Sequence, residues 1–141
     1  MEGALSVERF VAAQEPVWPA PLLELGQGRK RGHWMWFVFP QLIGLGHSEM
    51  ARHYAIRSEA EARTYLAHPL LASRLGEASR TLLRHRGRAP SEILGAVDAL
   101  KLCSSMTLFS MQPRTDPVFN EVLAAFFCGT PCAVTRAALG R

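Results

Sequence analysis

The sequence lacks any hydrophobic run long enough to cross a membrane. No window among its 141 residues approaches the about 18 apolar residues that a spanning helix needs. The first residues, Met-Glu-Gly-Ala, also lack the basic segment and apolar run of a secretory signal, so we expect no export. Repeats and low-complexity linkers are absent as well. With 48% apolar and 20% charged residues, the chain is expected to fold as one domain over residues 1–141.

Cysteine is scarce and odd in number, with only Cys103, Cys128 and Cys132. An odd count without an export signal predicts free thiols in a reducing compartment, and therefore a cytoplasmic location. Cys128 and Cys132 are four residues apart, but no second Cys or His pair lies nearby to complete a zinc site. We therefore expect neither a metal nor a cofactor.

Lysine is nearly absent too, with only Lys30 and Lys101. The net charge of +4 and the pI near 9.4 thus come from arginine. Basic residues gather at 29–31 and again at 80–88. These clusters either form a solvated surface or attract a phosphate-bearing partner, including nucleic acid.

No segment alternates polar and apolar residues between hairpin turns, which argues against strands. Helix signals are frequent instead: Ser58 with Glu61 fits a capping box, and His68-Pro69 and Asp116-Pro117 each suit the first turn of a helix. We predict an all-α fold of about six to eight short to medium helices. The predicted helices cover 6–14, 22–25, 48–54, 58–67 and 69–86, with others opening at Pro90, Pro117 and Pro131.

The segment 30–41 is the densest in aromatic side chains. Its apolar run fits either a buried strand or a buried helix. Trp34, Trp36, Phe37 and Phe39 either fill the core or wall a ligand pocket in which a planar group stacks. His33 is a structural histidine or a ligand-facing donor.

A second informative segment runs from Asp98 to Thr107. On a helix Asp98, Lys101 and Ser105 share one face, and we expect it beside an inward apolar face of Ile93, Val97 and Leu100. The hydroxyls up to Thr107 would lie near the end of the helix. Either they satisfy its last carbonyls, or Lys101 and the hydroxyls bind an anionic group while Asp98 orients the lysine.

These residues together resemble a known family. The string Gly32-His-Trp-Met-Trp-Phe-Val-Phe-Pro-Gln41, the Tyr65-Leu-Ala-His-Pro69 block and the Ser104-Ser105-Met-Thr-Leu-Phe109 block strongly resemble the DUF1810 family over essentially the whole chain. The resemblance implies a mainly helical protein of bacterial or fungal type. It implies no established activity.

Three functions remain open from the sequence. The first is binding of a nucleotide-like or other anionic small molecule between segment 30–41 and segment 98–107. If the chain is an enzyme, Asp98 or His33 would act as the acid or base. The second is a helical protein-interaction module without catalytic activity, and the third, less favoured, is a nucleic-acid binder. The oligomeric state is left open. The candidate ligand-binding residues are Lys30, His33, Trp34, Trp36, Gln41, Asp98, Lys101, Ser105 and Thr107.

Overall fold

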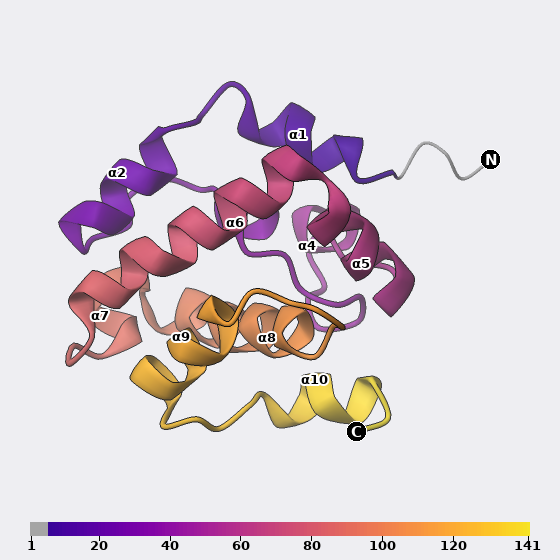
Figure 1. Cartoon of the computed structure of the whole chain (residues 1–141). Coiled ribbons are helices and arrows are strands. Elements are labelled where there is room, and N and C mark those ends of the chain that lie inside the picture. Colours follow the sequence, from indigo (N-terminus) through magenta and orange to yellow (C-terminus); the bar gives the residue numbers. More distant parts are fainter. Residues whose placement is uncertain (1–5) are drawn as a thin grey trace.

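The chain folds into successive helices wound around one long central helix, α6 (Figure 1). The structure, a computed structural model, describes residues 6–141; the N-terminal Met-Glu-Gly-Ala, on which the expected absence of a signal rests, lies outside them. The elements are α1 (Glu8–Gln14), α2 (Ala20–Gln27), α3 (Met35–Val38), α4 (Glu49–His53), α5 (Glu59–Ala67), α6 (Pro69–Leu82), the 3-10 turn η2 (Leu83–His85), α7 (Pro90–Leu94), α8 (Ala96–Ser110), α9 (Val118–Phe127) and α10 (Ala133–Ala138).

The all-α prediction is confirmed, although the described residues form ten α-helices, more than the six to eight expected. The extra elements are short, because glycine or an extended residue interrupts the chain often. Within residues 6–141, Leu42 and Ile56 form an isolated parallel bridge outside any named strand. No helix in this part of the chain is long and apolar enough to span a membrane.

Several helix starts lie where the sequence predicts them. The Ser58 hydroxyl accepts a hydrogen bond from the Glu61 N–H at 3.1 Å, and α5 follows. His68 Nδ1 accepts from the Leu71 N–H at 3.4 Å, while Pro69 occupies the first position of α6. Side chains that accept these otherwise unpaired N–H groups stabilise a helix start by about 1 kcal/mol each.

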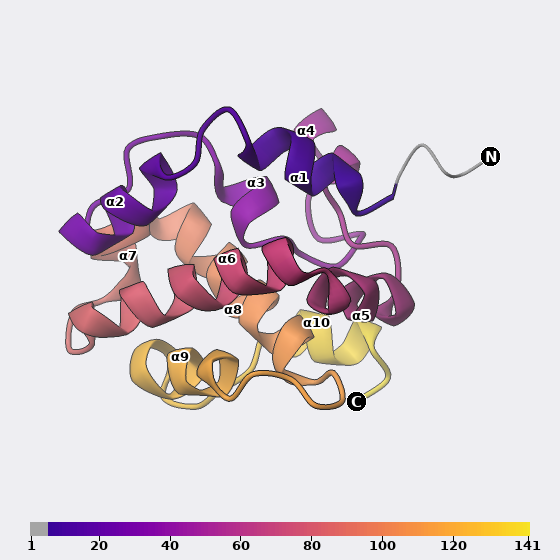
Figure 2. The ribbon, with the colours of Figure 1, turned by 45° about the horizontal axis from the view of Figure 1, so that its top comes forward.

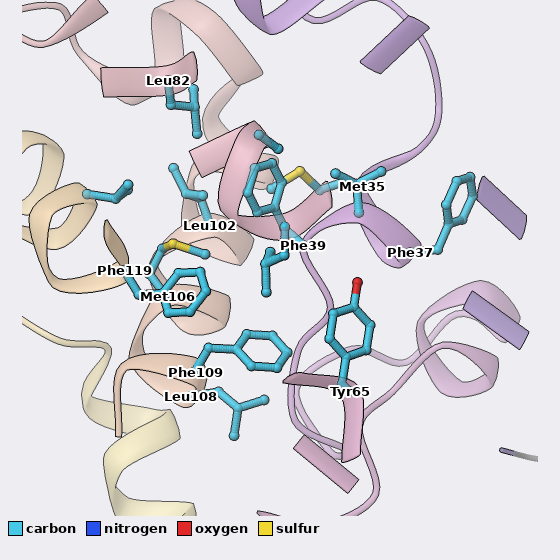
Figure 3. Packing of buried hydrophobic residues seen from close by; sticks show 14 of the residues in the cluster. Met35, Phe37, Phe39, Tyr65, Leu82, Leu102, Met106, Leu108, Phe109 and Phe119 are labelled. Carbon is cyan, nitrogen blue, oxygen red and sulfur yellow. The ribbon is translucent and has the colours of Figure 1, made fainter. Parts of the chain in front are cut away.

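The hydrophobic core lies where α6 and α8 meet segment 35–39 and α9. Figure 3 shows the Phe109 ring between Phe119 and Tyr65, with Phe39 on the side of Met35 and Leu102. On α6 the predicted inward residues Leu71, Leu75, Ala78 and Leu82 are all buried. Each large side chain removed from water in this way contributes roughly 1.5–3 kcal/mol.

The prediction that Ile93, Val97 and Leu100 all face inward is wrong in part. Ile93 is buried, but Val97 is 68% exposed and Leu100 is 72% exposed. The cause is Gly95, whose φ of 88° ends α7 and starts α8 in a new direction. Because the two helices do not share one axis, the spacing from Ile93 does not carry over to Val97 and Leu100.

Segment 30–41 is neither a strand nor a long helix. It makes one helical turn, α3, between two loops. Met35 and Phe39 enter the core, whereas Trp36 stays half-buried at its edge. The Gln14 amide, from α1, donates to the Phe37 carbonyl at 2.7 Å and so fixes this turn against α1.

Candidate functional site

Two lysines and one aspartate meet at the edge of the core and form what we call the lysine–aspartate cluster: Lys30, Asp98 and Lys101. Lys30 Nζ lies 2.9 Å from Asp98 Oδ2, and Lys101 Nζ lies 3.4 Å from Asp98 Oδ1. The three side chains are 10%, 17% and 21% exposed, in that order. The cluster is thus shielded but still reached by solvent.

Each ammonium of the cluster also faces an aromatic ring. Lys30 Nζ lies 5.2 Å from the centre of the Trp34 ring, and Lys101 Nζ lies 5.2 Å from the centre of the Trp36 ring. Both distances fall within the roughly 6 Å range of a cation–π interaction. The structure therefore brings together five of the residues that the sequence analysis singled out: Lys30, Trp34, Trp36, Asp98 and Lys101.

Lys30 and Lys101 differ in how much of their bonding capacity the protein uses. Lys30 Nζ also donates to the Gly32 carbonyl at 2.6 Å, and its backbone N–H donates to the Ile93 carbonyl at 2.8 Å. Among the described residues Lys101 has Asp98 as its one ion-pair partner, at 3.4 Å, and its ammonium donates to no carbonyl. An ammonium carries three donors, so Lys101 keeps donors for another molecule.

The loop that carries Lys30 is fixed by Glu24, a residue that sequence reasoning missed. One oxygen, Oε1, accepts hydrogen bonds from the N–H of Arg31 at 2.8 Å, the N–H of Gly32 at 2.9 Å and Trp34 Nε1 at 2.9 Å. Burial alone would raise the pKa of Glu24, but these hydrogen bonds and the nearby Lys30 outweigh it and lower the pKa. The only available signal was indirect: a buried tryptophan N–H needs an acceptor.

Ser105 lies on the same face of α8, one turn beyond Lys101. Its side chain is fully buried, and its hydroxyl has no hydrogen-bond partner among the described residues. Buried polar groups are nearly always paired, since an unpaired one costs about 1–3 kcal/mol. The hydroxyl is therefore the most conspicuous unsatisfied group next to the cluster.

The structure does not bring the other candidates into the cluster. His33 is exposed, and no described contact joins His33 or the side chain of Gln41 to it. Thr107 lies on the opposite side of α8, where its hydroxyl donates to the Cys103 carbonyl at 2.7 Å and accepts from the Cys132 N–H at 2.8 Å. Thr107 thus holds the segment before α10. The expected helix end at this point is also wrong, because α8 continues to Ser110.

The cysteines do not gather with other ligating side chains in residues 6–141. No group of three or more His, Cys, Asp and Glu side chains there is placed to hold a metal ion, and all three thiols are free. Burial, together with the neighbouring Cys132, raises the pKa of the Cys103 thiol.

The two basic clusters, at 29–31 and 80–88, are adjacent in the fold. His85 Nε2 lies 2.9 Å from the Leu25 carbonyl, and Gly28, which ends α2, lies against the Arg88 guanidinium and the His85 ring. Gly28 has a φ of 75°, a conformation that suits glycine. Arg80 and Arg88 have carboxylate partners in Asp116 and Glu92, which reduces the positive charge this surface offers.

The fold and the cluster define a small helical protein of a family without an assigned function. A profile described as "Protein of unknown function (DUF1810)" matches residues 4–139, so the chain belongs to the DUF1810 family. A solved structure, the conserved hypothetical protein Rv1873 from Mycobacterium tuberculosis, is similar to it, with 48% identity, 96% of each chain covered and a TM-score of 0.92. No curated protein matches the chain.

Proposed function

We propose that this protein binds an anionic small molecule at the lysine–aspartate cluster, with a planar, nucleotide-like group against Trp36. The observation that carries the proposal is the Lys101 ammonium, held between Asp98 and the Trp36 ring with donors to spare.

The charge of the cluster favours an anion. Two ammonium groups share the Asp98 carboxylate, and the nearby Glu24 offsets part of the charge of Lys30, so the positive charge that is left over lies mainly on Lys101. Because the side chains are largely shielded, that charge acts through a lower dielectric than bulk water and attracts an anion more strongly. The aromatic faces stabilise the ammonium groups without neutralising them.

The surroundings of the cluster suit the rest of such a ligand. Val97 lies one helical turn before Lys101, and Leu100 lies next to it; both are exposed. Together with Trp36 they offer an apolar surface beside the positive charge.

Asp98 serves in this proposal as a positioning residue. Both of its oxygens face lysines, which keeps the carboxylate occupied and the ammonium groups in place. We therefore propose binding and no reaction.

The test is a thermal-shift screen with AMP, NAD, ADP-ribose and sugar phosphates at two salt concentrations, followed by calorimetric titration. A ligand at about one hundred times its Kd stabilises the folded state by roughly 2.7 kcal/mol, which raises Tm by several degrees at this size. Lys101→Gln keeps much of the side chain and removes its charge; we expect at least tenfold weaker binding. Arg136→Gln, an exposed position on α10, is the control of equal charge change. The proposal is overturned if no compound in the screen raises Tm, or if Lys101→Gln binds the ligand as tightly as the unaltered protein does.

One observation favours the alternative of a protein partner. The exposed Val97 and Leu100 form an apolar pair on α8, beside the positive charge of Lys101. A partner helix with an apolar and an acidic side chain would cover both. Leu100→Glu would then abolish association with that partner and leave the folding stability of the protein unchanged.

A further inference from the structure

A cavity of about 870 Å³ lies away from the lysine–aspartate cluster, between α5, the start of α6 and the loop that joins α8 to α9. In Figure 2 this loop passes next to α5 at the lower right of the molecule. None of the candidate residues from the sequence lines it. We propose that it is a second binding site, for a small carboxylic acid with an apolar body.

The walls of the cavity are largely apolar. Leu66 comes from α5, Ala72 from α6, Phe119 from α9, and Pro113 and Pro117 come from the loop. Small-molecule sites are typically of roughly 300–1,000 Å³, with mainly apolar walls and a few polar groups that fix orientation. This cavity has that size and that composition.

Two arginines without carboxylate partners give the site its charge. Arg63 and Arg114 both line the cavity, and neither has an ion pair among the described residues. The one carboxylate in the lining, Asp116, is already engaged by Arg80 at 3.1 Å and by the Val118 N–H at 2.9 Å. A guanidinium presents paired donors that match a carboxylate.

The loop that presents Arg114 is held in place before any ligand arrives. The Thr115 hydroxyl donates to the Phe109 carbonyl at 2.7 Å, and Gln112 Nε2 donates to the Leu108 carbonyl at 3.0 Å. Arg114 itself has a φ of 57°, which places its side chain in a direction that an ordinary helical or extended residue would not. A loop that is already ordered loses less entropy on association.

The lining also contains an unsatisfied acceptor. Gln112 is 4% exposed, and its Oε1 has no hydrogen-bond partner among the described residues. Its Nε2 faces Glu59 Oε1 at 3.3 Å, so the amide is oriented with the oxygen as the free end.

The experiment uses N-acetyl-L-phenylalanine, which has a carboxylate, an amide N–H and an apolar ring, and its uncharged methyl ester. Titration of the ¹⁵N-labelled full chain, followed by NMR, should shift the amides of residues 63–72 and 112–119 with the acid. The ester should bind at least fivefold more weakly. Arg63→Gln and Arg114→Asn should each weaken binding of the acid at least fivefold; Asn suits the left-handed backbone at position 114.

Two controls separate this site from the lysine–aspartate cluster and from general charge. Arg136→Gln removes one positive charge outside the cavity, and Lys101→Gln disables the cluster; both should bind the acid as the unaltered protein does. Ala67→Trp, at an exposed position in the cavity wall, should block it. The proposal is overturned if the acid shifts no amides at this site, or if acid and ester bind equally.

Discussion

Replacing Glu24 by glutamine should destabilise the protein, because it removes the negative charge that holds the loop carrying Lys30. Glutamine keeps the size of the side chain and an acceptor oxygen. It therefore isolates the effect of the negative charge on the three N–H groups that converge on Oε1. Glu77→Gln, on the exposed face of α6, removes the same charge without disturbing these contacts.

The magnitude follows from how well each donor is shielded. A hydrogen bond to a charged group contributes about 1.5–3 kcal/mol and a neutral one about 0.5–1.5 kcal/mol. The Arg31 N–H is exposed and can bond to water, while Trp34 is 3% exposed and cannot. Because the three bonds share one oxygen, their differences do not add, and we expect a loss of about 1.5 kcal/mol, which lowers Tm by about 6 °C at this size.

The pH dependence gives the sharper test. The pKa of Glu24 in the folded protein is lowered, as the hydrogen bonds from Gly32, Arg31 and Trp34 outweigh the opposing effect of burial. A lowered pKa stabilises the folded state above the unfolded pKa of about 4.3, and this contribution is lost as pH falls through the folded value. Calorimetric melts from pH 7 to pH 3 should therefore show that the difference in Tm between the unaltered protein and Glu24→Gln becomes smaller below about pH 4. A difference in Tm under 1 °C at pH 7, or one that does not become smaller in acid, would refute the reasoning.

Two further predictions concern the core and the thiols. Phe109→Ala should cost about 3–5 kcal/mol in urea unfolding, because the ring is fully buried and lies 5.3 Å from the Tyr65 ring and 6.0 Å from the Phe119 ring; Leu100→Ala, at an exposed position, should cost under about 0.5 kcal/mol, and comparable losses would contradict the assigned core. At pH 8, iodoacetamide should modify the exposed Cys128 before Cys103, because the raised pKa of Cys103 lowers its thiolate fraction. Peptide mass spectrometry over time measures the order of modification, and equal rates at the two cysteines would contradict the prediction.

The helix starts could be predicted because their causes are local. Ser58, His68-Pro69 and Asp116-Pro117 act within one turn, through a side-chain acceptor or a fixed φ, so neighbouring residues contain the information. Segment 30–41 could not be assigned in the same way. Its apolar run fits any buried element, and the single turn it forms depends on the distant amide of Gln14.

The candidate site shows the same division between local and distant information. Helical spacing was enough to place Asp98, Lys101 and Ser105 on one face. It could not show that Glu24 fixes the Lys30 loop, since that contact depends on how α2 lies against segment 30–34. The hydroxyl of Thr107, nine residues after Asp98, points to the other side of the helix and serves the chain before α10.

Gly95 explains why the face that carries the cluster is open to solvent at all. A single helix through Ile93 and Lys101 would turn Val97 and Leu100 inward with Ile93, and the side of α8 that follows them would be covered. The positive φ of Gly95 breaks this continuity, so Ile93 closes the core while Val97 and Leu100 face outward beside Lys101. Two exposed branched side chains cost the folded protein the stability that their burial would supply, roughly 1.5–3 kcal/mol each. A ligand or partner that binds at Lys101 and covers Val97 and Leu100 would gain this burial free energy on association, which is why their exposure fits a binding surface.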